Sequence, residues 1–277
     1  MGAVMSYTTL LVYVDVGATN EEAVRVAAGL ADKFTAILIG MSALEVRPPF
    51  VTDVVFVQEL VDADLKERRA KLAATETWFR AAAGADHRKI AWRGMLDLPT
   101  EALAREARCA DLVVVRRTRR AMDVYSALDP GGAILKAGRP VLIVPDGVSS
   151  LRAEHVVIGW KDGREARRAV QDALPFLHEA ARVTIAEICG SGEEEAVRAH
   201  LDDVAHYLTR HRINGGPRII VHHKGSGAAA LIRLAQEEAA DLLVVGAYGH
   251  SRLGEWIFGG VTRELLATSP ICCLMSH

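Results

Sequence analysis

The sequence predicts an α/β protein made of two consecutive domains, and three observations support this prediction. Half of the 277 residues are hydrophobic, so the chain can bury a sizeable core. Short apolar runs rich in β-branched residues alternate with longer stretches in which apolar residues recur every three or four positions. The chain also repeats itself, because ARCADLVVV at 107–115 resembles EEAADLLVV at 237–245.

The repeat continues beyond these two segments without a gap. Pro140, which opens an apolar run, lies 29 residues after Asp111. Pro270, which opens the run ICCLM, lies 29 residues after Asp241. We therefore predict an N-terminal domain at 1–148 and a C-terminal domain at 149–277, with the polar segment 146–155 between them.

Each half contains five predicted strands in the same order. Those of the first half are 9–16, 35–41, 88–94, 111–115 and 141–145, and those of the second are 155–160, 182–188, 218–223, 241–246 and 271–275. Predicted helices lie between them at 20–34, 53–83, 98–110, 164–180, 192–212, 227–240 and 261–269. The alternation predicts right-handed βαβ units, and so a five-stranded parallel sheet flanked by helices in each half.

Composition excludes several classes of protein. Lys and Arg number 33 against 35 Asp and Glu, so no polyanion is implied as a partner, and the basic segment 116–120 is expected to be a solvated loop. The four cysteines form no CxxC pair, which favours a reducing compartment. No apolar run approaches the roughly 20 residues that span a bilayer. We therefore expect a soluble, cytoplasmic protein that binds neither nucleic acid nor membranes.

Glycines gather after one predicted strand of the second half. Gly246 ends the strand and Gly249 follows. After nine intervening residues, Gly259 and Gly260 precede a predicted helix that begins near Val261. Glycine allows a bulky anion to approach the backbone, and the free N–H groups of a helix start attract negative charge. The arrangement therefore favours a phosphate-bearing ligand.

At these residues the chain resembles a tandem universal stress protein. The family motif is glycine, two residues, glycine, nine residues, glycine and then Ser or Thr, and its three glycine positions are matched with the spacing intact. The resemblance covers both halves and implies two Rossmann-like domains of the adenine nucleotide alpha hydrolase-like type. It also implies a stress-response protein that binds ATP, with or without Mg²⁺. The implied nucleotide-lining residues are Val245, Gly246, Gly249, Gly259, Gly260 and Val261.

The sequence departs from the family pattern at two places in the second half. Gly260 stands where the family has a hydroxyl side chain, so one hydrogen bond to phosphate, worth about 1.5–3 kcal/mol, is expected to be missing. Lys161 stands where the family tends to have an Asp after the first strand, and Asp162 follows it. Two roles for Asp162 stay open, a contact to the nucleotide and the N-cap of the next helix.

The first half has lost the glycine motif. The positions that correspond to the three motif glycines are Arg116, Arg119 and Asp129, so we expect no nucleotide there. Gly131 and Gly132 are expected to form a turn.

Other candidate residues favour structural roles. His222 and His223 are adjacent on a predicted strand, so they point to opposite faces and cannot bind one metal together, and Cys272 and Cys273 are expected to pack in the core. No metal site and no catalytic motif is found.

The sequence thus predicts a binding protein, while an interaction module without nucleotide and a slow ATP hydrolase remain alternatives. The last strands of the two halves are apolar and would form exposed edges unless they were paired. We expect them to pair antiparallel in an intramolecular pseudo-dimer, which leaves homodimerisation open.

Overall fold

The computed structural model describes residues 6–17, 21–46, 57–84, 89–117, 123–221, 226–249 and 260–277. The elements of the first half are β1 (Thr9–Tyr13), α1 (Glu22–Phe34), β2 (Ile37–Ala43), α2 (Val57–Ala82), β3 (Ile90–Met95), α3 (Pro99–Glu106), a 3₁₀ turn (Ala107–Cys109), β4 (Leu112–Arg116), α4 (Pro130–Lys136) and β5 (Val141–Val144). Those of the second half are β6 (His155–Trp160), α5 (Arg164–Glu179), β7 (Arg182–Cys189), α6 (Glu194–Arg210), β8 (Gly215–Val221), α7 (Gly227–Glu237), β9 (Leu242–Gly246), α8 (Gly260–Thr268) and β10 (Cys272–Ser276).

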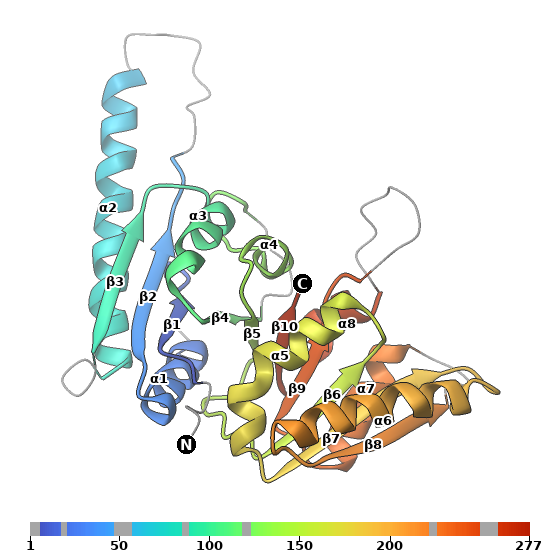
Figure 1. Cartoon of the computed structure of the whole chain (residues 1–277). Coiled ribbons are helices and arrows are strands. Elements are labelled where there is room, and N and C mark those ends of the chain that lie inside the picture. Colours follow the sequence, from blue (N-terminus) through green and yellow to red (C-terminus); the bar gives the residue numbers. More distant parts are fainter. Residues whose placement is uncertain are drawn as a thin grey trace.

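The strands form one continuous sheet in the order β3-β2-β1-β4-β5-β10-β9-β6-β7-β8 (Figure 1). Within each half every pairing is parallel. The two halves join where β5 and β10 pair antiparallel, with Leu142 opposite Leu274. The predicted α/β class, the five strands in each half and the antiparallel pairing of the last strands are therefore confirmed.

Helices cover both faces of this sheet. Buried residues of α1, α2, α5 and α6 belong to one apolar cluster, and those of α3, α4, α7 and α8 belong to the other.

Successive residues of a strand point to opposite faces, so Cys272 lies in the first cluster and Cys273 in the second. Both cysteines are at most 1% exposed, and burial raises the pKa of the Cys273 thiol to about 11. Their predicted packing role is confirmed.

The aspartate that the two repeats share has the same role in each half. The carboxylate of Asp111 accepts hydrogen bonds from the backbone amides of Thr8 at 2.8 Å and Thr9 at 3.0 Å. In the second half the carboxylate of Asp241 accepts from the amide of His155 at 3.1 Å. Each aspartate therefore ties the first strand of its half to the fourth.

Side chains from both halves also pack against one another. The ring of Tyr7 lies 5.1 Å from that of Phe34 and 5.4 Å from that of Phe176, in edge-to-face contacts between ring centroids. The Tyr7 hydroxyl donates to the carbonyl oxygen of Asp172 on α5 at 2.5 Å. Aromatic pairs of this kind add stability beyond the area that they bury. The halves therefore share a core as well as a sheet.

Two details of the first half differ from the sequence prediction. Gly131 and Gly132 belong to the first turn of α4, and Asp129 caps this helix by accepting from their amides. Pro130 at the first helical position needs no hydrogen bond to its nitrogen, so the DPGG segment starts a helix instead of making only a turn.

The expected solvated loop at 116–120 is wrong at Arg117. The side chain of Arg117 is only 10% exposed, and it donates to the Ser269 carbonyl oxygen of the other half at 2.8 Å. Residues 118–120 lie outside the described residues. No helix in the described part of the chain is long and apolar enough to cross a membrane.

Candidate functional site

The retained glycine motif lies at the carboxyl edge of the second half, where the strand order reverses. β6, the first strand of this half, pairs with β9 on one side and with β7 on the other. Gly159 of β6 lies opposite Val245 of β9, so Gly246 and the residues after β6 emerge side by side. Ligands of open α/β sheets bind at such a switch point.

Gly246 is in direct contact with the start of α5. A Cβ atom on Gly246 would lie 2.5 Å from the amide nitrogen of Ala166 and 2.6 Å from the carbonyl carbon of Glu165. Both are backbone atoms, so a side chain could be accepted only if the helix moved. Gly246 therefore has a packing role at this site in addition to the predicted role toward a ligand.

Gly249 lies beside a charged side chain that the sequence analysis did not identify. A Cβ atom on Gly249 would lie 3.2 Å from Oε2 of Glu165, in the first turn of α5. Glu165 is 5% exposed, and its Oε1 accepts a hydrogen bond from Nε of Arg164 at 2.5 Å. Burial alone would raise the pKa of Glu165, but the hydrogen bond from Arg164, a backbone hydrogen bond and the nearby charge of His277 lower it overall. The protein thus places its own carboxylate at the helix N-terminus beside the motif.

The second part of the motif begins α8. Gly260 is the first residue of this helix, and a Cβ atom there would meet no atom of the described residues within 4 Å. Val261 is 40% exposed, and its Cγ2 would lie 3.2 Å from a Cβ atom on Gly227 at the start of α7. Gly259 lies outside the described residues. The helix predicted to start near Val261 is therefore present, with an open approach to its first turn.

Asp162 does not cap the following helix. The N-cap of α5 is Gly163, which forms no side-chain cap hydrogen bond, and the carboxylate of Asp162 instead accepts from Nη2 of Arg167 at 2.7 Å. Of the two roles that the sequence left open, the capping role is wrong, and the ligand contact stays a prediction.

Tyr248, between the first two motif glycines, connects the site to the other half. Its backbone has a left-handed φ of 59°, and its amide donates to Oγ1 of buried Thr262 on α8 at 3.3 Å. The Tyr248 hydroxyl lies 2.6 Å from where a Cβ atom on Gly131 would be. Burial and the nearby charge of Asp129 raise its pKa to about 12. The motif segment therefore contacts the start of α4.

The corresponding edge of the first half has different chemistry. Nη2 of Arg116 lies 3.2 Å from Oδ1 of Asp146, and Asp129 caps α4, so both side chains are engaged. Arg119 lies outside the described residues. β1 and β6 have the same register with β4 and β9, since Leu10 pairs with Leu112 and Val156 with Leu242.

This common register makes Asp15 of the first half equivalent to Lys161 of the second. The first half therefore has an aspartate after its first strand but no glycine motif, and the second half has the glycines but a lysine.

The remaining candidates give no metal site. His222 and His223 lie outside the described residues, which include no cluster of three or more His, Cys, Asp or Glu that could hold a metal ion. At the glycine-rich start of α7, Ser226 caps the helix by accepting from the Ala229 amide at 3.1 Å.

Comparisons with known proteins agree with this geometry. Residues 152–277 match the model of the universal stress protein family. The whole fold is similar to a universal stress protein from Archaeoglobus fulgidus DSM 4304, with 14% identity, 97% of each chain covered and a TM-score of 0.70. It is also similar to a putative universal stress protein from Pseudomonas aeruginosa UCBPP-PA14, with 14% identity, a TM-score of 0.61, and coverage of 98% of this chain and 93% of that one. The comparison with curated proteins finds no match. At these identities the structural likeness establishes the fold of both halves.

Proposed function

We propose that this protein binds ATP, with or without Mg²⁺, through its C-terminal half, because residues 152–277 match the model of the universal stress protein family. One observation carries the proposal. Gly246 and Gly249 lie at the carboxyl end of β9 and Gly260 lies at the start of α8, beside the switch point between β6 and β9. We assign the protein to stress-response sensing or regulation, with the N-terminal half as a structural partner.

In this proposal main-chain amides hold the phosphates. Gly246 and Gly249 permit close approach at the strand end, and the first amides of α8 at Gly260 and Val261 provide donors together with the helix dipole. Gly259, Val245 and Asp162 complete the set of proposed ligand contacts. Access to these amides is supported by the space around Gly260, because no side chain of the described residues lies within 4 Å of its Cβ position.

We propose binding without catalysis. Among the described residues near the end of β9, the carboxylates of Asp162 and Glu165 could act as a base, and each is paired with an arginine. A general base needs a free position within hydrogen-bond reach of the proton that it removes. A slow ATPase activity would require one of these pairs to open.

A second candidate function, an interaction module that binds no nucleotide, is favoured by Glu165. Its buried carboxylate lies beside Gly249, where it would repel a triphosphate, and Lys161 stands in place of an aspartate. In this candidate the surface around Gly260 and Val261 would contact a protein partner.

Calorimetry with protein stripped of small molecules separates the two candidates. We expect saturable ATP binding with one site per chain, and loss of that binding in Gly249→Lys, because a lysine side chain would occupy the place proposed for the phosphates beside Glu165. Gly29→Lys is the matched control, since Gly29 lies on the exposed side of α1 with nothing within 4 Å of its Cβ position. Absence of ATP binding up to millimolar concentration would leave the interaction module as the better assignment.

A further inference from the structure

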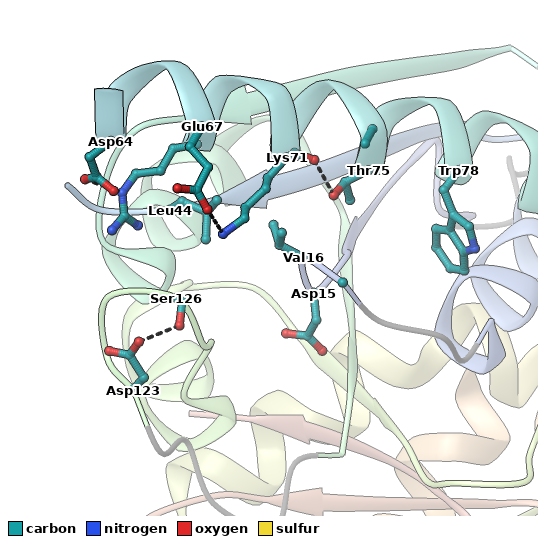
Figure 2. A pocket seen from close by; sticks show the side chains of 13 residues that line it. Asp15, Val16, Leu44, Asp64, Glu67, Lys71, Thr75, Trp78, Asp123 and Ser126 are labelled. Carbon is teal, nitrogen blue, oxygen red and sulfur yellow. Dashed lines mark hydrogen bonds and ion pairs between the residues drawn. The ribbon is translucent and has the colours of Figure 1, made fainter. Parts of the chain in front are cut away.

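The first half contains a cavity that the proposed function does not use. It has a volume of about 760 Å³, within the range of small-molecule sites, and lies at the carboxyl ends of β1 and β2 beneath α2. Asp15 and Val16 follow β1, Leu44 follows β2, and Asp123 and Ser126 belong to the segment after β4 (Figure 2).

The two basic residues of the cavity wall are already paired. On α2, Arg68 lies 2.7 Å from Asp64 and Lys71 lies 2.6 Å from Glu67, each one helical turn away. Figure 2 shows these side chains along the helix above the cavity. Four carboxylates against two cations line the wall, so the cavity is net acidic. A phosphate or carboxylate ligand would meet no unpaired positive charge among the described α2 residues that line the cavity.

Among the cavity residues that the structure describes, Asp15 is the carboxylate for which no partner is found. Across the cavity, Asp123 accepts from the Ser126 hydroxyl at 2.7 Å, whereas the part of the chain that the structure describes offers Asp15 neither a hydrogen bond nor an ion pair. The charge of Arg116 acts on Asp15, but its guanidinium is paired with Asp146. Burial raises the pKa of Asp15, with Arg116 acting in the opposite direction. A partly buried carboxylate in this state gains stability from a cation that reaches it.

The rest of the wall is apolar and aromatic. Val16, Leu44, Ala74 and Trp78 line the cavity, and Figure 2 shows the Trp78 indole extending from α2 at the end away from Asp123. A tryptophan face attracts organic cations and packs against apolar groups. The cavity therefore combines an unpaired carboxylate with a surface for a hydrophobic or aromatic body.

We propose that this cavity binds a small organic cation, a primary amine on an aromatic or apolar body. The ammonium group would pair with Asp15, and the body would lie against Leu44 and Trp78. Nothing in this inference depends on nucleotide binding by the second half.

The equivalent place in the second half lacks this chemistry. The common register places Lys161 where the first half has Asp15, so a positive charge stands where the cavity has its carboxylate. The amine site is thus specific to the first half.

Titration calorimetry of the full chain tests the inference with three probes of one shape. We expect 2-phenylethylamine to bind at one site, and 2-phenylethanol and phenylacetate to bind at least about tenfold more weakly, because they lack the ammonium group. Asp15→Asn should weaken amine binding by about tenfold or more, whereas Asp202→Asn, on the exposed side of α6, should leave it unchanged.

Two further measurements keep the inference falsifiable if Asp15→Asn is poorly folded. The indole N–H resonance of Trp78, assigned with Trp78→Phe, should shift during titration with the amine. Gly249→Lys should retain amine binding, which separates this site from the proposed ATP site. Equal binding of the amine and the alcohol, preference for phenylacetate, or an unchanged Trp78 resonance would overturn the inference.

Discussion

Gly246 and Ala166 are in backbone contact, because a Cβ atom on Gly246 would lie 2.5 Å from the Ala166 amide nitrogen. The contact fixes the end of β9 against the start of α5, the two elements that frame the candidate nucleotide site. The first glycine of the motif is therefore required by the fold of this half whether or not a ligand is bound.

Gly246→Ala should destabilise the protein by about 1–3 kcal/mol, since the added methyl group meets backbone atoms that cannot rotate away. Gly260→Ala is the matched control, because the space around Gly260 is open, and its free energy of unfolding should stay within about 0.5 kcal/mol of wild type. Urea unfolding measures both. Equal stabilities of the two variants would show that the contact at Gly246 is not tight in solution.

Gly260→Ser should tighten ATP binding by about tenfold or more, because a hydroxyl at the start of α8 can donate to a phosphate. Gly260→Ala adds the same Cβ without the hydroxyl and should leave the dissociation constant nearly unchanged. Calorimetry with ATP distinguishes the two variants. If Ser and Ala have the same effect, the phosphates do not lie at this helix start.

Glu165→Gln should also tighten ATP binding, by roughly severalfold, because it removes a buried negative charge beside Gly249 and releases Arg164. The gain should shrink as salt concentration rises, since screening weakens the repulsion in the wild type. Glu195→Gln, at an exposed position of α6, changes the net charge equally and should have no effect. An unchanged affinity in Glu165→Gln would place the phosphates away from Gly249.

Phe176→Ala should lower the free energy of unfolding by about 3–5 kcal/mol, as expected for removal of a fully buried aromatic side chain. Because Phe176 contacts Tyr7 and Phe34 of the other half, both halves should lose stability together. Leu60→Ala, at a 52% exposed position of α2, serves as the control. Amide hydrogen exchange checks the result, and destabilisation of the second half alone would contradict a shared core.

Asp111→Asn should be destabilising at neutral pH, by about 1–3 kcal/mol, through loss of charge-assisted hydrogen bonds to Thr8 and Thr9. Burial alone would raise the pKa of Asp111, but these hydrogen bonds and the charge of Arg139 lower it overall. The stabilisation is therefore complete above the unfolded pKa of about 3.9 and is lost as pH falls through the lower folded value. Urea unfolding at pH 7, 5 and 3 should show the difference between variant and wild type shrinking only at the lowest pH.

The sequence was sufficient to predict the sheet because its strands are continuous apolar runs. The repeated Asp111 and Asp241 also show which positions of the two halves are equivalent. It did not predict α4, since Gly131 and Gly132 favour a turn unless a residue such as Asp129 caps a helix. β8 begins earlier than expected, at Gly215, because pairing with β7 outweighs the low strand preference of Gly and Pro.

The site was predictable in part. The motif glycines identified the end of β9 and the start of α8, but Glu165 lies far from them in the sequence and reaches Gly249 only through the packing of α5. Its sequence signal was the acidic residue in the first turn of the α5 helix. The acidic cavity of the first half was not predicted, because it depends on how α2 lies over the ends of β1 and β2.

The order of the strands also limits how copies of the chain can polymerise. β5 and β10 use each other as partners, so the continuous sheet ends at β3 and β8. β8 carries Pro217, whose nitrogen cannot donate a hydrogen bond to an added strand. At the β8 edge of the sheet, the addition of a strand from another copy is disfavoured, and so is fibre growth through that edge.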